Sequence, residues 1–305
     1  MRVNSLLVLA AVSASLSACE RLGEPATERQ PTAPSFQALP SDDWGPAVRL
    51  ASPWPNTAAL EGCPHESTNG RSLYFASNRN GNNDIFVAER DPDGEWGEPV
   101  AVAAVNSSAN DYCPTPLPDG GLLFVSERND GRNCGAPRAD IYHSRRDPSG
   151  VLLPPEHLGC VVNSPGHEWS PSYVPAGGGM LFFSSSRTGK QRIYVSFRGP
   201  DGSWQAPQDV AGLNDNLANS QRPNVSADGR EIVFDSDRSG SRGVDIWYSY
   251  RATPRSDWAP PIRLENETIN STATEARPSM SRDGKRLYFG SNRGGNFDIF
   301  VAERR

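Results

Sequence analysis

The sequence lacks the signatures of the common enzyme classes and of nucleic-acid binding. It holds no G-x-S-x-G elbow, no H-E-x-x-H motif and no glycine-rich phosphate loop. Lys and Arg number 30 against 36 Asp and Glu, so no basic excess is present to hold a nucleic acid. No helical period recurs, which excludes a helical solenoid. The few histidines are scattered, and we expect them at the surface rather than as zinc ligands: His65, His143, His157 and His167.

The N-terminus predicts export. Arg2 is followed by the apolar run LLVLAAV, which is typical of a signal peptide and too short to span a membrane as a mature helix. The segment LSAC, ending at Cys19, resembles a bacterial lipobox, in which the cysteine becomes the lipid-bearing first residue. An ordinary signal peptide with a chance cysteine is the alternative. We therefore predict a signal peptide over residues 1–18 and a lipidated, flexible tether over residues 19–41, where Pro, Thr, Ser and Glu predominate.

The resemblance to a lipobox also implies a location. Glu20, rather than an aspartate, follows the cysteine, and in similar lipoproteins this favours the outer membrane over the inner one. Removal of Arg2 with the signal peptide leaves the rest of the chain more acidic still. We therefore expect the lipid to make the membrane contact, on an outer-membrane protein that faces the periplasm.

Residues 42–305 contain an internal repeat. The element F-x-S-x-R occurs five times, and each copy is followed by a short polar loop and then by DIF, DIY, RIY or DIW. A proline lies upstream of each copy, usually followed by an NG, DG or GGG turn. Alternating apolar and polar residues on both sides of such a turn predict a β-hairpin.

A tryptophan element completes each unit. W-x-x-P-x-x-L, or a close variant, begins at Trp44, Trp96, Trp204 and Trp258, and Leu152–Leu158 takes its place once. Each unit then holds four short strands, which predicts an all-β fold, a five-bladed β-propeller with four-stranded blades. One tryptophan element precedes the first hairpin and none follows the last. We therefore predict that residues 43–51 pair with residues 298–304, complete blade five and close the ring.

The last repeat carries a family resemblance. The segment Glu275–Ala302, EARPSMSRDGKRLYFGSNRGGNFDIFVA, resembles the WD40-like propeller repeat of TolB type. The resemblance covers residues 56–305 in five copies and implies the propeller fold. It implies no particular activity, because propellers host many.

Four of the repeats have an acidic residue three residues before the proline: Glu61, Asp111, Glu168 and Glu275. In blade four Ser220 stands at this position. Such carboxylates, at the start of the innermost strands, would ring one mouth of the channel. A ring of this kind could hold a cation such as calcium or act on a sugar.

The hairpin register favours a structural role for these acids. A turn at Asp119 and Gly120 places Arg128 opposite Asp111, and the other repeats place arginine beside the acid. We therefore predict ion pairs that brace the blades and expect no cofactor. The bracing arginines end the five F-x-S-x-R elements: Arg79, Arg128, Arg187, Arg238 and Arg293.

Four cysteines follow Cys19, an even number in an exported domain, and predict disulfides: Cys63, Cys113, Cys134 and Cys160. Three pairings are open. The first two cysteines precede equivalent prolines on neighbouring inner strands, and the last two lie in loops of one face. We favour Cys63 with Cys113 and Cys134 with Cys160.

The loop that holds Cys134 departs from the repeat, being the longest of its class. Two aromatic residues nearby stand where other blades have small or polar ones. Functional residues tend to lie where a repeat is broken. We predict that a partner docks across blades two and three; the alternative is an idle loop with the tryptophan packed between blades. The candidate residues are Tyr112, Arg132, Arg138 and Trp169.

Two functions remain open. Every acid that could serve a glycosidase recurs from blade to blade, whereas catalytic groups should break the repeat because chemistry is asymmetric. We favour a non-enzymatic envelope lipoprotein, monomeric, that binds a protein or a cell-wall component. The alternative is a carbohydrate-active enzyme, a glycosidase or lyase, that uses the acids at the channel mouth.

Overall fold

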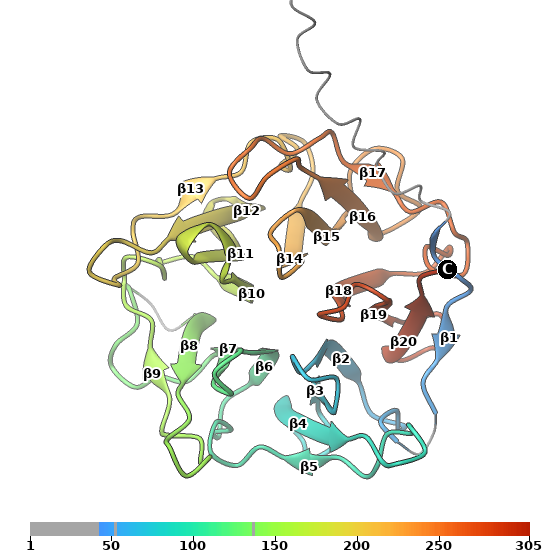
Figure 1. Cartoon of the computed structure of the whole chain (residues 1–305), viewed down its shortest axis with the longest axis horizontal. Coiled ribbons are helices and arrows are strands. Elements are labelled where there is room, and N and C mark those ends of the chain that lie inside the picture. The colour runs from blue at the N-terminus through green and yellow to red at the C-terminus, as the bar shows by residue number, and fades with distance from the viewer. Residues whose placement is uncertain (1–42, 52–53, 136–137) are drawn as a thin grey trace, which may run out of the picture. The chain divides into compact units, whose positions relative to one another are not determined.

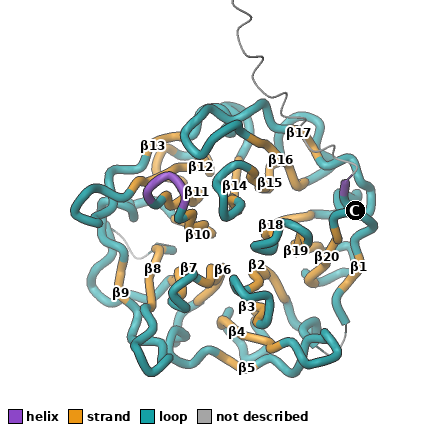
Figure 2. The backbone as a smooth tube through the Cα atoms, in the orientation of Figure 1, coloured by secondary structure: helices purple, strands orange, loops and turns teal. Residues whose placement is uncertain are grey.

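The computed structural model describes residues 43–51, 54–135 and 138–305. These residues form five four-stranded antiparallel sheets, arranged as blades around a central axis (Figure 1). Strands and loops dominate, and helix is limited to short turns such as η2 (Ala176–Gly178) (Figure 2). The predicted signal peptide, the tether and Cys19 lie outside the described residues. Within the described residues, no helix is both long and apolar enough to cross a membrane.

Each blade runs from an innermost strand to a two-residue outermost strand, so the all-β, five-bladed prediction is confirmed. Blade one consists of β2 (Glu61–Glu66), β3 (Ser72–Ser77), β4 (Asp84–Glu89) and β5 (Val100–Ala101), and blade two of β6 (Asp111–Pro116), β7 (Leu122–Ser126), β8 (Asp140–Ser144) and β9 (Glu156–His157). Blade three consists of β10 (Glu168–Val174), β11 (Met180–Thr188), β12 (Lys190–Phe197) and β13 (Gln208–Asp209), and blade four of β14 (Ser220–Val225), β15 (Glu231–Ser236), β16 (Asp245–Tyr250) and β17 (Ile262–Arg263). Blade five consists of β18 (Glu275–Met280), β19 (Arg286–Ser291), β20 (Asp298–Glu303) and β1 (Val48–Arg49).

The N-terminal strand closes the ring, as the sequence predicts. Strand β1 pairs antiparallel with β20, with Val48 opposite Val301. Arg49 Nε donates to Asp298 at 2.7 Å, and Trp44 bridges to Arg304. Trp44 is 2% exposed and packs in a cluster drawn from blades four and five. The first and last strands of the ring therefore lie in one sheet (Figure 1).

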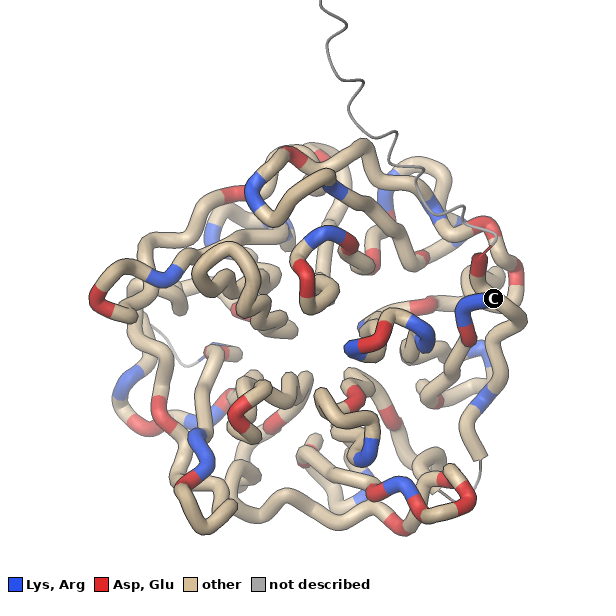
Figure 3. The backbone as a smooth tube through the Cα atoms, in the orientation of Figure 1, with Lys and Arg blue, Asp and Glu red and all other residues tan. Residues whose placement is uncertain are grey.

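The core is divided among the blade interfaces. Five apolar clusters within the described residues each join two adjacent blades. The phenylalanine that opens F-x-S-x-R is fully buried in every blade, because strand alternation turns it toward the neighbouring sheet. Acidic and basic residues are interspersed along the backbone of all five blades (Figure 3). The apolar clusters are joined by a few ion pairs between blades, such as Arg286 with Glu66 and Arg304 with Glu231, each at 2.8 Å.

The same backbone irregularity recurs in the innermost strand of every blade. The residue before the strand's proline has a positive φ, between 46° and 58°, and the ladder shifts register there: Cys63, Cys113, Ser170, Arg222 and Arg277. Such a conformation costs a non-glycine residue about 1–3 kcal/mol. Each inner strand is therefore a bulged strand that turns one side chain toward the axis.

This bulge corrects the predicted hairpin register. Asp111 lies opposite Ser126, rather than opposite Arg128. The simple count fails by two residues. The turn is one residue longer than the count assumed, since Leu117 pairs with Gly121, and the bulge inserts a further residue between Tyr112 and Thr115. The serine of F-x-S-x-R faces the acid, and the arginine two residues later reaches back to it.

Candidate functional site

The recurring acids and arginines form ion pairs inside each blade. Arg128 Nη2 donates to Asp111 Oδ1 at 2.7 Å, and the other acid-bearing blades give 3.0–3.2 Å: Arg79 with Glu61, Arg187 with Glu168, and Arg293 with Glu275. In blade four, Arg238 Nη2 instead donates to Ser220 Oγ at 2.7 Å. Each guanidinium also stacks on the buried phenylalanine of its own motif at 4.9–5.7 Å. These side chains hold the blades together.

The acids do not ring an open mouth, so that part of the sequence interpretation is wrong. Glu61, Asp111, Glu168 and Glu275 are all 0% exposed. The connector before each strand also donates to the acid, as Ser164 does to Glu168 through its backbone N–H and its hydroxyl. Burial raises the pKa of Glu168, and these donors and Arg187 oppose the shift. Carboxylates engaged in this way are unavailable to a sugar or a cation.

The histidines also differ from expectation. His157, predicted at the surface, has a side chain 3% exposed, and its Nε2 lies 3.0 Å from Asp140. His65 lines the axial cavities, and burial lowers its pKa to about 4. His167 lies beside Arg138 on the loop face. Among the described residues, no group of three or more His, Cys, Asp or Glu side chains is placed to hold a metal ion.

Both disulfides follow the favoured pairing. Cys63 bonds to Cys113 with a Cα–Cα distance of 4.7 Å, and Cys134 bonds to Cys160 at 5.4 Å. The first links the innermost strands of blades one and two. The second fixes the long loop between β7 and β8 to the connector that follows β9, although residues 136–137 of this loop lie outside the described residues. The disulfide therefore anchors the loop at Cys134.

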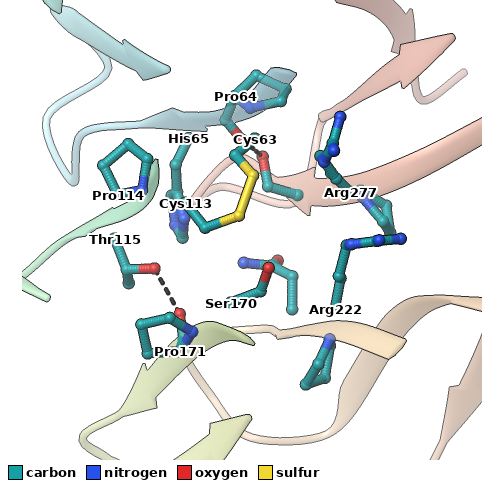
Figure 4. Close-up of a pocket in the computed structure, with 14 residues that line it drawn as sticks. Cys63, Pro64, His65, Cys113, Pro114, Thr115, Ser170, Pro171, Arg222 and Arg277 are labelled. Carbon is teal, nitrogen blue, oxygen red and sulfur yellow. Dashed lines mark hydrogen bonds between the residues drawn. A yellow bond between two sulfur atoms is a disulfide. The ribbon is translucent and has the colours of Figure 1, made fainter. Parts of the chain in front are cut away.

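Cavities follow the axis from one face of the propeller to the other. We call the face with the β2–β3 type of hairpin turns the turn face, and the opposite one the loop face. The smallest of the three, about 20 Å³, is lined by the pre-proline residues of all five blades (Figure 4). It lies between a cavity of about 50 Å³ toward the turn face and one of about 160 Å³ toward the loop face.

The larger of these axial cavities, which we call the mouth pocket, lies between blades one and two and is completed by Trp169 of blade three and Arg277 of blade five. Its lining comes from the inner strands and the loop-face connectors: Leu60, Gly62, Cys63, Ala76, Asn83, Asn110, Tyr112, Glu127, Trp169 and Arg277. Tyr112 and Trp169, predicted to act together, meet edge to face with ring centroids 5.9 Å apart. Both are half-buried, so Trp169 packs between blades and lines the pocket at once.

The polar side of the mouth pocket is organised around Glu127. The Tyr112 hydroxyl donates to one Glu127 oxygen at 3.0 Å, and the Asn110 amide donates to the other at 2.8 Å. Burial and the nearby Glu127 raise the pKa of the Tyr112 hydroxyl. The tyrosine therefore stays neutral and is fixed as a donor to this carboxylate.

The predicted arginines lie outside the pocket. Arg138 is exposed at the rim, and its Nη1 lies 3.0 Å from His167 Nε2, whose ring contacts Trp169. Arg132 is exposed in the long loop and does not line the mouth pocket. Of the four candidate residues, Tyr112 and Trp169 line the mouth pocket and Arg138 is linked to Trp169 through His167, while their contact with a partner stays a prediction.

Two further arginines were missed by the sequence analysis. Arg222 and Arg277 occupy the pre-proline position that holds cysteine or serine in the other blades (Figure 4). Arg222 stacks on Trp169 at 5.0 Å and pairs with Asp235 at 2.7 Å. The sequence does show that this position changes from cysteine or serine in blades one to three to arginine in blades four and five, but it does not show that these side chains meet at the axis.

Comparisons with known proteins identify the fold. No protein-family model matches the chain, and no curated protein matches it. The structure of a putative TolB from Agrobacterium tumefaciens is 20% identical, with 80% of this chain and 76% of that chain covered and a TM-score of 0.49. A thermostable family-43 glycoside hydrolase is 15% identical over 83% of this chain and 91% of that chain, with a TM-score of 0.56. The endo-arabinase from Bacteroides thetaiotaomicron is 14% identical over 85% of this chain and 95% of that chain, with a TM-score of 0.54. At these identities the likeness is one of fold alone.

Proposed function

We propose that this protein is a non-enzymatic cell-envelope lipoprotein whose propeller binds a protein or cell-wall partner at the mouth pocket. One observation carries the proposal: the side chains that break the repeat, Tyr112, Trp169 and Arg277, gather around a single cavity. The acids that recur are buried in ion pairs and serve the scaffold. A binding role uses the side chains around the cavity and does not require the buried acids.

The partner docks across blades two and three. Arg138 and His167 form the rim on that side, and the Cys134–Cys160 disulfide anchors the neighbouring loop. A loop held in place before binding loses less conformational freedom when a partner arrives, which favours affinity. Arg132, exposed in the same loop, would meet the outer part of such a partner.

We further propose how the propeller is attached to the membrane and that it is monomeric. Cys19 carries the lipid, and residues 19–41 separate the propeller from the outer membrane on its periplasmic side. The protein acts as a monomer, because ring closure leaves two-residue outermost strands, such as β5 and β9, as edges. Edges this short offer little to a second sheet.

Site-specific photo-crosslinking in intact cells tests the docking face. A photoreactive residue at position 138 reports on the loop face, and one at Asn69, exposed in a turn between β2 and β3, reports on the turn face. We expect a discrete adduct from position 138 that is lost in Trp169→Ala, and none from position 69. Equal adducts from both positions, or an adduct indifferent to Trp169, would contradict docking at the mouth pocket.

A glycan screen addresses the competing enzymatic role. The purified protein is incubated with plant and bacterial polysaccharides beside Glu168→Gln and Glu275→Gln. We expect no turnover by any of the three proteins, because both carboxylates are engaged and 0% exposed. Turnover by the wild type that disappears in either variant would instead establish a carbohydrate-active enzyme.

A further inference from the structure

The two arginines of the axial ring are not equivalent, because a single buried carboxylate serves both. Asp235 is 0% exposed, and its Oδ2 accepts from Arg222 Nη1 at 2.7 Å. Its Oδ1 accepts from the backbone N–H of Arg277 at 2.9 Å. Both oxygens are thus occupied, and the side chain of Arg277 receives neither. Arg222 is neutralised, whereas the Arg277 guanidinium is left over.

The Arg277 guanidinium lies against groups that offer it little. It stacks on the Phe297 ring at 5.1 Å and passes over Gly62, where an added β-carbon would lie 2.8 Å from its Nη1. This Nη1 is buried without a hydrogen-bond partner among the residues that the structure describes. Burial and the nearby Arg222 lower its pKa to about 10, so it remains charged at neutral pH. Arg277 as a whole is half-buried, but its Nη1 is a buried donor that no group among the described residues uses, and such a donor costs stability.

Other donors near Arg277 share this state. The Nε of Arg222 and the Nε1 of Trp169 are also buried and find no acceptor in the described part of the chain. Both groups only donate hydrogen bonds. Trp169 lines the mouth pocket, Arg222 lines the small axial cavity beside it, and Arg277 lines both, so the boundary of the two cavities has a surplus of donors and lacks an acceptor.

The charges of the residues that line the mouth pocket indicate which kind of acceptor fits there. Within the described residues, the charged side chains that line the mouth pocket are Arg277 and Glu127, and the Glu127 oxygens are already engaged. The donors to Glu127, Tyr112 and Asn110, are neutral, so the lining carries one positive and one negative charge. An acid that pairs with Arg277 therefore lies near the charge of Glu127, and a phosphate, which carries up to two negative charges, meets more repulsion there than a carboxylate, which carries one. A carboxylate also matches the planar guanidinium with two oxygens.

We propose that Arg277 makes the mouth pocket a carboxylate-recognition site, which takes a carboxylate borne on a small ring or short apolar group. The inference rests on the proposed binding function and specifies its chemistry. The cavity of about 160 Å³ receives the body of the ligand, and Tyr112 and Trp169 form one wall. Two sources offer this chemistry in an envelope: the free carboxylate of a peptide, and the acidic substituent of a cell-wall sugar.

Calorimetric titration with matched probes tests the site and separates the sources. The sugar pair is N-acetylmuramate, which has a carboxylate, and N-acetylglucosamine, which has none. The peptide pair is acetyl-alanyl-alanine as the free acid and as the amide. We expect at least one acid to bind about tenfold or more tightly than its neutral counterpart, as for other hydrogen bonds to charged groups. Whichever pair discriminates identifies the source.

Variants assign the discrimination to Arg277. Arg277→Gln should abolish the preference for the acid, and Gly62→Ala should weaken it by displacing the guanidinium. Arg71→Gln, an exposed arginine on the turn face, serves as the matched control and should change nothing. Without ligand, Arg277→Gln should melt at the same temperature as the wild type or higher, because an unpartnered charge is removed. If Arg277→Gln instead fails to fold, Gly62→Ala alone decides.

Three results would overturn the proposal: equal binding of acid and neutral probes, a preference that survives Arg277→Gln, or no binding by any of the four probes. None of these removes the proposed function, because crosslinking from position 138 reports on docking irrespective of the ligand's charge. Loss of that crosslink with intact acid binding would leave a carboxylate site without a docked partner.

Discussion

At the scale of single residues, His65 shows how a channel position affects stability. It follows Pro64 on strand β2 and lines the two axial cavities on the turn-face side. Burial disfavours the charged imidazolium and lowers its pKa from 6.5 to about 4. The folded protein therefore holds His65 neutral in a pH range where the unfolded chain would protonate it.

This shift predicts a loss of stability in mild acid. The contribution of His65 is complete above pH 6.5 and falls as the pH drops toward 4, because the unfolded state then binds the extra proton. At 1.36 kcal/mol per pKa unit the effect reaches at most about 3 kcal/mol, and partial exposure reduces it. We expect the unfolding free energy of His65→Gln to change less than that of the wild type between pH 7 and pH 4. Parallel curves from urea unfolding of the two proteins would contradict this assignment.

Residue roles could be predicted from the sequence where they repeat. The pairs of Arg128 with Asp111 and Arg293 with Glu275 follow from the repeat, because the same two residues recur at a fixed spacing. Arg222 and Arg277 could not be assigned in this way, since their role depends on which blades adjoin and on Asp235, which is remote in sequence from Arg277. Their buried environment exists only in the closed ring.

At the scale of elements, strand β1 determines whether the ring closes. Without it, β20 would present an unpaired edge, and Trp44 would no longer cover Leu264 and Phe300 in their shared cluster. Asn266 also donates to the carbonyls of Trp44 and Gly45, so blade four holds the closing segment directly. The segment thus belongs to two blades.

Deleting residues 43–51 should greatly destabilise the propeller. Loss of Trp44 burial alone costs about 3–5 kcal/mol by comparison with other large-to-small changes, and the ladder to β20 goes with it. The exposed edge should also promote association between molecules. Thermal unfolding and light scattering measure both effects. A chain that begins at residue 43 is the control and should melt like the full chain; a deletion that melted at that same temperature would refute closure by β1.

Strand order and closure were predictable because the tryptophan element is displaced by one strand. The exact register was not. The bulge before each proline depends on a positive φ that non-glycine residues rarely adopt, and nothing in the residue types of Cys113 or Arg222 indicates it. The same bulge recurs in all five inner strands, and in each it turns one side chain toward the axis.

At the scale of the whole molecule, two disulfides supplement a ring built from inter-blade contacts. The Cys63–Cys113 bond spans 50 residues and ties blade one to blade two beside the axis. The Cys134–Cys160 bond spans 26 residues near the loop face. Neither bond crosses the interface that β1 closes, so covalent and strand closure stabilise different parts of the ring.

Removal of each disulfide should lower stability roughly according to the loop it closes. The chain-entropy relation gives about 4 kcal/mol for Cys63→Ala/Cys113→Ala and about 3.5 kcal/mol for Cys134→Ala/Cys160→Ala. Guanidinium unfolding without reductant measures both losses, and a reductant should bring the wild type toward the double variants. An unchanged midpoint for the first variant would show that the ring contacts alone hold blades one and two together.

The five bulges have a consequence for how such a protein diversifies. Each presents one side chain to the axis from nearly the same backbone conformation, whether that residue is Cys63, Ser170 or Arg277. The backbone therefore does not distinguish among them, so a substitution at Ser170, Arg222 or Arg277, which lie outside the disulfides, changes the chemistry of the axis while the bulge stays the same. Because these positions can vary independently, related chains would differ in the ligand they bind while keeping the same fold.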